Sequence, residues 1–134
     1  MRYISHRITI INVRKPSLPS INEQLQWLAT SLGLFSLRDR NKTCFRIFID
    51  LLKSAKHRRA LTSDEIADHL SMSRGTVIHH INHLIDSGIV VRDGSTYMLR
   101  VDSLSDLIDE VEKDIQRTLH DLREVARSID SRLD

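Results

Sequence analysis

The stretch from Arg74 to His83 holds the side chains best suited to chemistry. Placed on a helix, its apolar and short polar residues separate onto opposite sides. The apolar side holds Val77, Ile81 and Leu84, and the polar side holds Gly75, Thr76, His79, Asn82 and His83. Short side chains that donate hydrogen bonds are suited to base edges in the major groove of a duplex. The alternative is a merely solvated helix face, which would normally carry Glu and Lys.

The start of this helix adds groups that contact phosphate or guanine. Ser73 is the expected N-cap, and Arg74 lies at the end that would enter a groove first. Thr76, together with free backbone amides, is placed to hold a phosphate oxygen. Gly75 is unfavourable inside a helix, and its missing side chain would let a duplex backbone approach closely.

The flanking residues predict the elements that position this helix. Thr62 and Glu65 form a capping box before a short helix with Ile66, Ala67 and Leu70 on its apolar face. Ser71 and Met72 make a turn into the helix 73–87, which Gly88 closes.

A hairpin is predicted over 89–100, since Asp93-Gly94 between two β-rich runs favours a type I′ turn. Arg92 beside its tip and Arg100 at its far end would reach the minor groove or a phosphate.

Another amphipathic helix precedes this unit, with Phe45, Phe48, Ile49 and Leu52 at helical spacing. We expect Cys44 at its start to be a buried small residue. Basic residues lie on or after this helix, and some are expected to reach phosphates: Lys42, Arg46, Lys53, Lys56, Arg58 and Arg59.

The N-terminal part, residues 1–36, is predicted to form a strand over Ile8–Val13 that joins the hairpin sheet or reaches a partner chain. Ser20 and Glu23 form a second capping box. The helix that follows carries Leu25, Leu28 and Leu32 on one face, and Gly33 is placed to end it. Trp27 is expected to pack in the core, although it would also suit a ligand pocket.

The last part, residues 101–134, is predicted to be one helix of about 30 residues, roughly 45 Å long. Its apolar residues approximate a heptad seam: Leu104, Ile108, Val111, Ile115, Leu122, Val125 and Ile129. Leu107, Leu119, Ala126 and Leu133 widen this stripe. A helix this long needs a second chain to cover its apolar side, whereas its acidic residues look like a solvated face.

Two short helices followed at once by a hairpin describe a winged helix-turn-helix. The segments NKTCFRIFIDLL (41–52) and TSDEIADHLSMSRGTVIHHINHLIDSGIVVRDGSTYML (62–99) resemble the ArsR-like and MarR-like winged-helix regulators of bacteria and archaea. The resemblance implies a mainly α fold with a small β-hairpin wing. Residues 37–100 would be the DNA-binding domain, 1–36 a packing or dimerisation arm and 101–134 a C-terminal dimerisation helix.

Metal and cofactor sites are not predicted. His79 and His83 lie one helical turn apart, a spacing that can bind a divalent metal. The cysteine pair that the ArsR-like family uses is missing from 62–70, and His120 is the one histidine of the last helix. We therefore expect His79 and His83 to touch DNA, with His80 at the edge of the core.

Composition narrows the remaining classes. With 134 residues, 40% of them apolar and 28% charged, the chain is typical of a single globular domain. One cysteine cannot form an internal disulfide, and no apolar run approaches the ~20 residues needed to span a bilayer. No Gly-rich phosphate loop or G-x-S-x-G motif points to an enzyme. The expectation is a cytoplasmic, non-enzymatic protein.

Charge is distributed unevenly. Residues 1–35 carry +3, residues 36–100 carry +4 and residues 101–134 carry −5. This arrangement favours a body that faces a polyanion and a final helix that points away from it.

The function predicted is a sequence-specific double-stranded DNA-binding transcription regulator, a homodimer that acts as a repressor. Ser73, Arg74, Gly75, Thr76, His79, Asn82, His83 and Arg92 would contact DNA. Two alternatives stay open: a winged-helix module that binds another protein of the transcription or chromosome machinery, and a metal- or ligand-gated sensor of the ArsR type.

Overall fold

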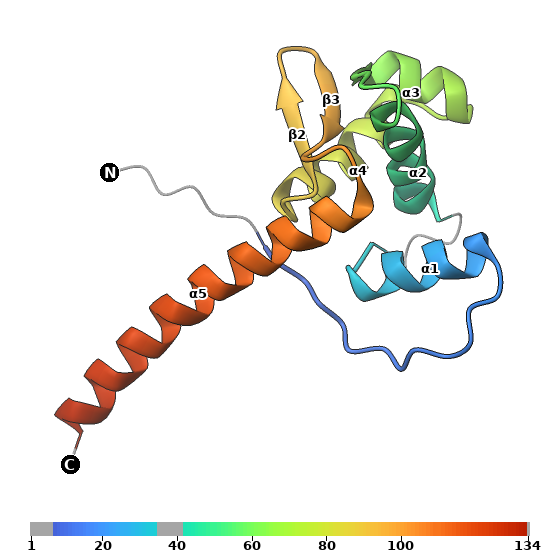
Figure 1. Cartoon of the computed structure of the whole chain (residues 1–134). Coiled ribbons are helices and arrows are strands. Elements are labelled where there is room, and N and C mark those ends of the chain that lie inside the picture. The colour runs from blue at the N-terminus through green and yellow to red at the C-terminus, as the bar shows by residue number, and fades with distance from the viewer. Residues whose placement is uncertain (1–6, 35–41, 134) are drawn as a thin grey trace.

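The computed structural model describes residues 7–34 and 42–133, and Figure 1 shows their arrangement. In chain order the elements are α1 (Ile21–Ser31), α2 (Thr43–Ala55), β1 (Leu61–Thr62), α3 (Ser63–Leu70), α4 (Arg74–Asp86), β2 (Val90–Asp93), β3 (Thr96–Leu99) and α5 (Leu104–Arg132). The fold is mainly helical with a small antiparallel sheet, a winged helix-turn-helix with a long C-terminal helix. This confirms the predicted fold class.

The core lies where α2 packs against α4 and β3, and where α3 packs against α4. Phe48, Ile66, Ile81 and Leu84 contribute fully buried side chains. Each falls on the apolar side expected from helical periodicity, because only that side can leave water when the helices meet.

The predicted N-caps of α1, α3 and α4 are confirmed, although at α1 only the Ser20 half of the predicted capping box is found. Ser20, Thr62 and Ser73 each accept a hydrogen bond from the backbone N–H three residues later. At Thr62 the capping box is reciprocal, since the Glu65 carboxylate accepts from the Thr62 N–H at 3.2 Å. These bonds satisfy amides that the first turn of a helix leaves unpaired.

The sheet has the order β1-β3-β2, and its third strand does not come from the segment that the sequence suggested. Leu61 pairs with Tyr97 and Thr62 with Thr96, so β1 lies directly before α3. The expected strand at residues 8–13 is wrong: no regular element forms between residues 7 and 19.

The turn of the hairpin also differs from the prediction. Asp93 pairs with Thr96, which leaves Gly94 and Ser95 as the two loop residues. Gly94 has φ +61°, whereas neither Asp93 nor Ser95 has a positive φ. Positive φ at the first loop position alone fits a type II′ turn rather than type I′.

The N-terminal segment is held to the body by scattered hydrogen bonds instead of strand pairing. The N–H of Arg7 donates to the carbonyl of Asp86 at the end of α4, and that of Ile11 donates to Ser31 at the end of α1. Gly33 has φ +72° and ends α1 as predicted.

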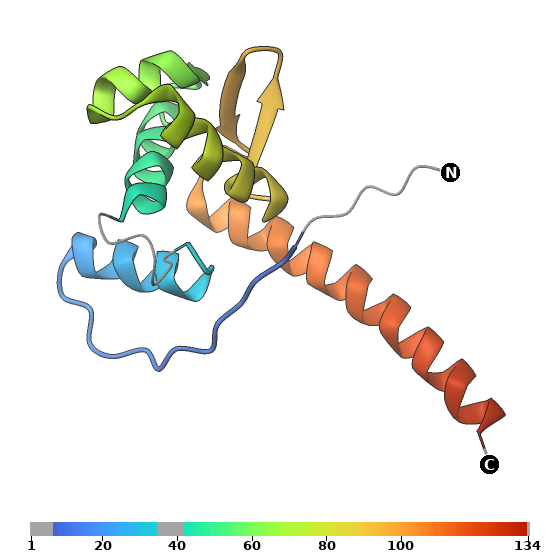
Figure 2. The same cartoon turned by 180° about the vertical axis from the view of Figure 1, so that it is seen from behind.

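Helix α5 has two halves with different surroundings. In its first half Leu107 and Val111 are buried against the body. Its second half projects clear of the body, as the views from the front and from behind both show (Figures 1 and 2). There the apolar side chains are exposed: Leu119, Leu122, Val125, Ile129 and Leu133.

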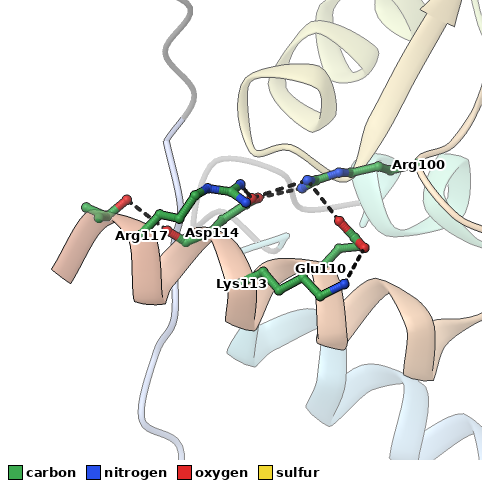
Figure 3. Close-up of polar contacts among 6 residues, drawn as sticks. Arg100, Glu110, Lys113, Asp114 and Arg117 are labelled. Atoms are coloured by element: carbon green, nitrogen blue, oxygen red, sulfur yellow. Dashed lines mark hydrogen bonds and ion pairs between the residues drawn. The ribbon is translucent and has the colours of Figure 1, made fainter. Parts of the chain in front are cut away.

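A cluster of charges fastens the wing to α5 (Figure 3). Arg100, which follows β3, donates to the carboxylates of Asp114 and Glu110. Arg117 also pairs with Asp114, and Lys113 with Glu110. Two expectations are corrected: Arg100 is not free for DNA, because α5 holds it, and Asp114 is buried rather than solvated.

Candidate nucleic-acid interface

Helix α4 is anchored on one side and open on the other. Val77, Ile81 and Leu84 have no exposed surface and fix the helix in the core. Every residue that the sequence assigned to DNA contact is exposed: Ser73, Arg74, Gly75, Thr76, His79, Asn82, His83 and Arg92. Seven of these eight residues therefore lie on the free side of α4 or at its start, and Arg92 lies on β2.

Arg74 places a positive charge at the N-terminal end of α4. Arg74 Nε lies 3.7 Å from Asp64 Oδ1, and both side chains are about two-thirds exposed or more (67% and 73%). An exposed ion pair contributes little, ~0–1 kcal/mol. The guanidinium can therefore exchange Asp64 for an external anion at small cost.

The hydroxyls at this end are already used within the helix. Ser73 Oγ accepts from the Thr76 N–H at 3.1 Å and lies 2.8 Å from Thr76 Oγ1. The hydroxyls of Ser73 and Thr76 therefore form one small unit, which orders the first turn of α4. An anion placed there would meet a preformed helix N-terminus with its partial positive charge.

Gly75 is exposed, and a Cβ built on it would meet no atom within 4 Å. The protein's own packing therefore does not require glycine at this position.

The wing places Arg92 near its tip. Its Nε donates to the carbonyl of Gly94 at 2.8 Å, which holds the exposed side chain along the turn. The outward part of β2, from Val91 to Asp93, is exposed, while Tyr97 and Leu99 of β3 are buried. A wing of this shape leaves one edge and its tip available for contact.

Two of the basic residues near α2 have partners on α3 that the sequence did not indicate. Arg46 Nη2 donates to the carbonyl of Leu70 at 2.9 Å, at the end of α3. Arg59 pairs with Glu65 at 2.6 Å, beside the capping box at the start of the same helix. The contacts of Arg46 and Arg59 hold α3 in place. Their partners lie 24 and 6 residues away in the sequence, so no local sequence pattern indicates them.

The histidines divide between the open face and the body. The rings of His79 and His80 meet edge to face at 5.2 Å, and His80 is half-buried, as predicted. The sequence missed His69, whose Nδ1 lies 3.0 Å from Asp50 and ties α3 to α2.

Within the described chain, side chains close enough to share a metal are found at His120, Asp121 and Glu124. All three are exposed on α5 rather than on α4.

Comparison with known proteins agrees with this arrangement. Residues 41–93 match a family model described as a helix-turn-helix domain. No curated protein and no solved structure matched the chain. The match spans α2, the helix-turn-helix pair and β2, which is the part that carries the exposed face. Fold and match together support a DNA-binding regulator of the helix-turn-helix class.

No helix in the described ranges has the length and apolar character needed to cross a membrane.

Proposed function

We propose that the protein is a sequence-specific double-stranded DNA-binding transcription regulator of the ArsR-like or MarR-like type. It acts as a homodimer, and the simplest mechanism is repression by occupying a promoter in the cytoplasm. The observation that carries the proposal is the free face of α4. Its polar residues are exposed while its apolar residues are fully buried.

The face has the chemistry that direct readout requires. Asn82 can pair with adenine in the major groove, and Arg74 with guanine or a phosphate. His79 and His83 add donors one turn apart on the same side. Residue types that both donate and accept distinguish bases, whereas a purely basic face would read charge alone.

The wing and the body would supply contacts without sequence preference. Arg92 is held near the wing tip, where it can approach the minor groove or the sugar-phosphate backbone. Each phosphate neutralised would steepen the salt dependence of binding.

The second half of α5 supports the homodimer. Its exposed leucine, valine and isoleucine side chains form one stripe that this chain does not cover. Pairing two such stripes would bury them, and a two-fold dimer of this kind would carry two copies of α4. Successive major grooves lie about 34 Å apart, so the expected operator is a pseudo-palindrome.

Selection of bound duplexes from random double-stranded DNA tests the proposal. We expect an enriched, pseudo-palindromic motif that binds at least about 10³-fold more tightly than a scrambled duplex at the same salt concentration. Weak, sequence-blind binding would refute the proposal and favour a winged-helix module that binds another protein.

A further inference from the structure

A cavity of about 780 Å³ lies among the N-terminal segment, α1, α2 and the first turn of α5. This volume falls within the range of roughly 300–1,000 Å³ that is typical of small-molecule sites. Apolar side chains from all three helices line it: Leu25, Trp27, Leu28, Ile49, Leu52 and Leu104.

The cavity has a positively charged rim. Lys15 of the N-terminal segment and Lys53 and Lys56 of α2 line it, and all three are exposed. None of the described residues that line it is acidic. Because these ammonium groups border apolar surface, a ligand with one negatively charged end gains attraction there while its body leaves water.

The wall formed by the N-terminal segment is tied down by hydrogen bonds to α1. The indole N–H of Trp27 donates to the carbonyl of Arg14 at 3.3 Å, and the amide of Gln24 donates to Leu18 at 3.0 Å. The indole N–H of Trp27 and the side-chain amide nitrogen of Gln24 are therefore engaged within this wall, and the cavity offers mainly apolar faces and lysine charges.

We propose that this cavity binds an amphipathic organic anion, an alkyl or aromatic body that carries a carboxylate. The lysine rim favours an anion over a neutral apolar molecule.

The cavity shares a helix with the DNA-facing unit. Ile49, Leu52, Lys53 and Lys56 line it from α2, and α2 also packs against α4. An anion that favours one position of α2 would therefore change the equilibrium that positions α4. This regulatory consequence rests on the proposed DNA binding, whereas the binding site itself does not.

Trp27 is the single tryptophan of the chain, so its emission reports on the cavity directly. The full-length protein is titrated with 8-anilinonaphthalene-1-sulfonate, and the bound probe is then displaced by decanoate or by decanol. We expect saturable quenching of Trp27, displacement by decanoate, and weaker displacement by decanol. The double variant Lys53→Gln/Lys56→Gln should bind the probe about 3- to 10-fold more weakly, as the loss of two exposed charge contacts would give.

Arg123→Gln/Arg127→Gln is the matched control, because both arginines are exposed on α5 outside the cavity and the double change removes the same number of charges, so this variant should bind like the wild type. Three results would overturn the site: no saturable quenching, equal displacement by decanoate and decanol, or unchanged binding in the double variant. Probe binding that falls as protein concentration rises would also overturn it, in favour of a face covered by a second copy.

The regulatory consequence is measured separately, as the affinity for the selected duplex with and without decanoate. A changed affinity supports coupling between the cavity and α4, and an unchanged affinity overturns that coupling alone. If the chain does not bind DNA at all, the proposed function fails, while the Trp27 titration still decides the cavity.

Discussion

Arg100 and Asp114 form the contact that sets the direction of α5 relative to the wing. The guanidinium donates to both carboxylate oxygens of Asp114, at 2.5 and 3.2 Å, and Asp114 is only 4% exposed. The hydrogen bond to Asp114 raises the pKa of Arg100, against the lowering effect of burial. The Arg100 guanidinium is therefore charged at every working pH, and its pairing with Asp114 joins the wing to the helix that projects from the body.

Removing the buried carboxylate should destabilise the protein. Asp114→Ala leaves Arg100 partly buried without its main partner, which costs about 3 kcal/mol, the lower end of the range for breaking a buried ion pair. The lower end applies because Arg100 keeps 23% of its side chain in contact with water. Urea denaturation measures the effect. Asp121→Ala, at an exposed acidic residue of the same helix, should stay within about 0.5 kcal/mol of the wild type.

The open face of α4 should carry affinity without carrying stability. Arg74→Ala or His79→Ala is expected to weaken binding to the selected duplex by about 1–3 kcal/mol. The melting temperature should not change, since both side chains are exposed. Arg127→Ala and His120→Ala are the controls, because they make the same changes on the exposed second half of α5. Equal losses in test and control variants would show that α4 does not read the duplex.

Gly75→Ala separates stability from binding at one position. The added methyl group meets no atom of the protein, so the helix should gain about 0.5–1 kcal/mol of stability. If a duplex approaches this backbone closely, the same methyl group should reduce DNA affinity. Thermal unfolding and a binding titration on one sample give both values. A more stable variant with unchanged affinity would rule out close approach at Gly75.

The apolar stripe on α5 should determine the oligomeric state. Leu122→Glu with Ile129→Glu places two charges where the proposed dimer buries apolar surface, so sedimentation equilibrium should find monomers. Arg127→Glu changes the net charge by the same amount on another side of the helix and should stay dimeric. A double variant that sediments like the wild type would place the dimer interface elsewhere.

Truncation after Thr118 gives an independent version of that test. It removes the exposed half of the stripe and retains Leu107, Val111 and Asp114, which the body uses. The truncated chain should fold, become monomeric and bind the selected duplex much more weakly.

Acid stability should depend on the capping box of α3. The pKa of Glu65 is lowered, chiefly because the backbone N–H of Thr62 donates to its carboxylate, with Arg59 adding to the effect and desolvation opposing it. A carboxyl whose pKa is lower in the folded state stabilises the fold above its unfolded pKa of about 4.3. That contribution is lost as the pH falls through the folded-state value.

Glu65→Gln keeps a capping box but removes the titrating group. The variant should therefore show a smaller drop in melting temperature than the wild type when the pH is lowered from about 5 to about 3. Glu23→Gln, the equivalent position of α1, is the control and should follow the wild-type curve. An equal drop in the Glu65→Gln variant would contradict the role given to this carboxylate.

Local patterns within the sequence determined the helices and the face of α4. A cap needs partners only three residues apart, as with Ser73 and Thr76, and the separation of His79 from Ile81 follows from helical geometry alone. The long final helix was predictable for the same reason, because its apolar period repeats along one segment.

Tertiary structure decided what depends on residues distant in the chain. The third strand pairs Leu61 with Tyr97, and the isolated pattern at residues 8–13 could not compete for that edge. Arg100 is drawn to Asp114 because the chain turns into α5 and buries the carboxylate beside it. The cavity forms only where the irregular N-terminal segment meets α1, α2 and α5, and its lysines come from that segment and from the end of α2. Such pairings are set by which surfaces can be buried together, and that depends on the whole fold.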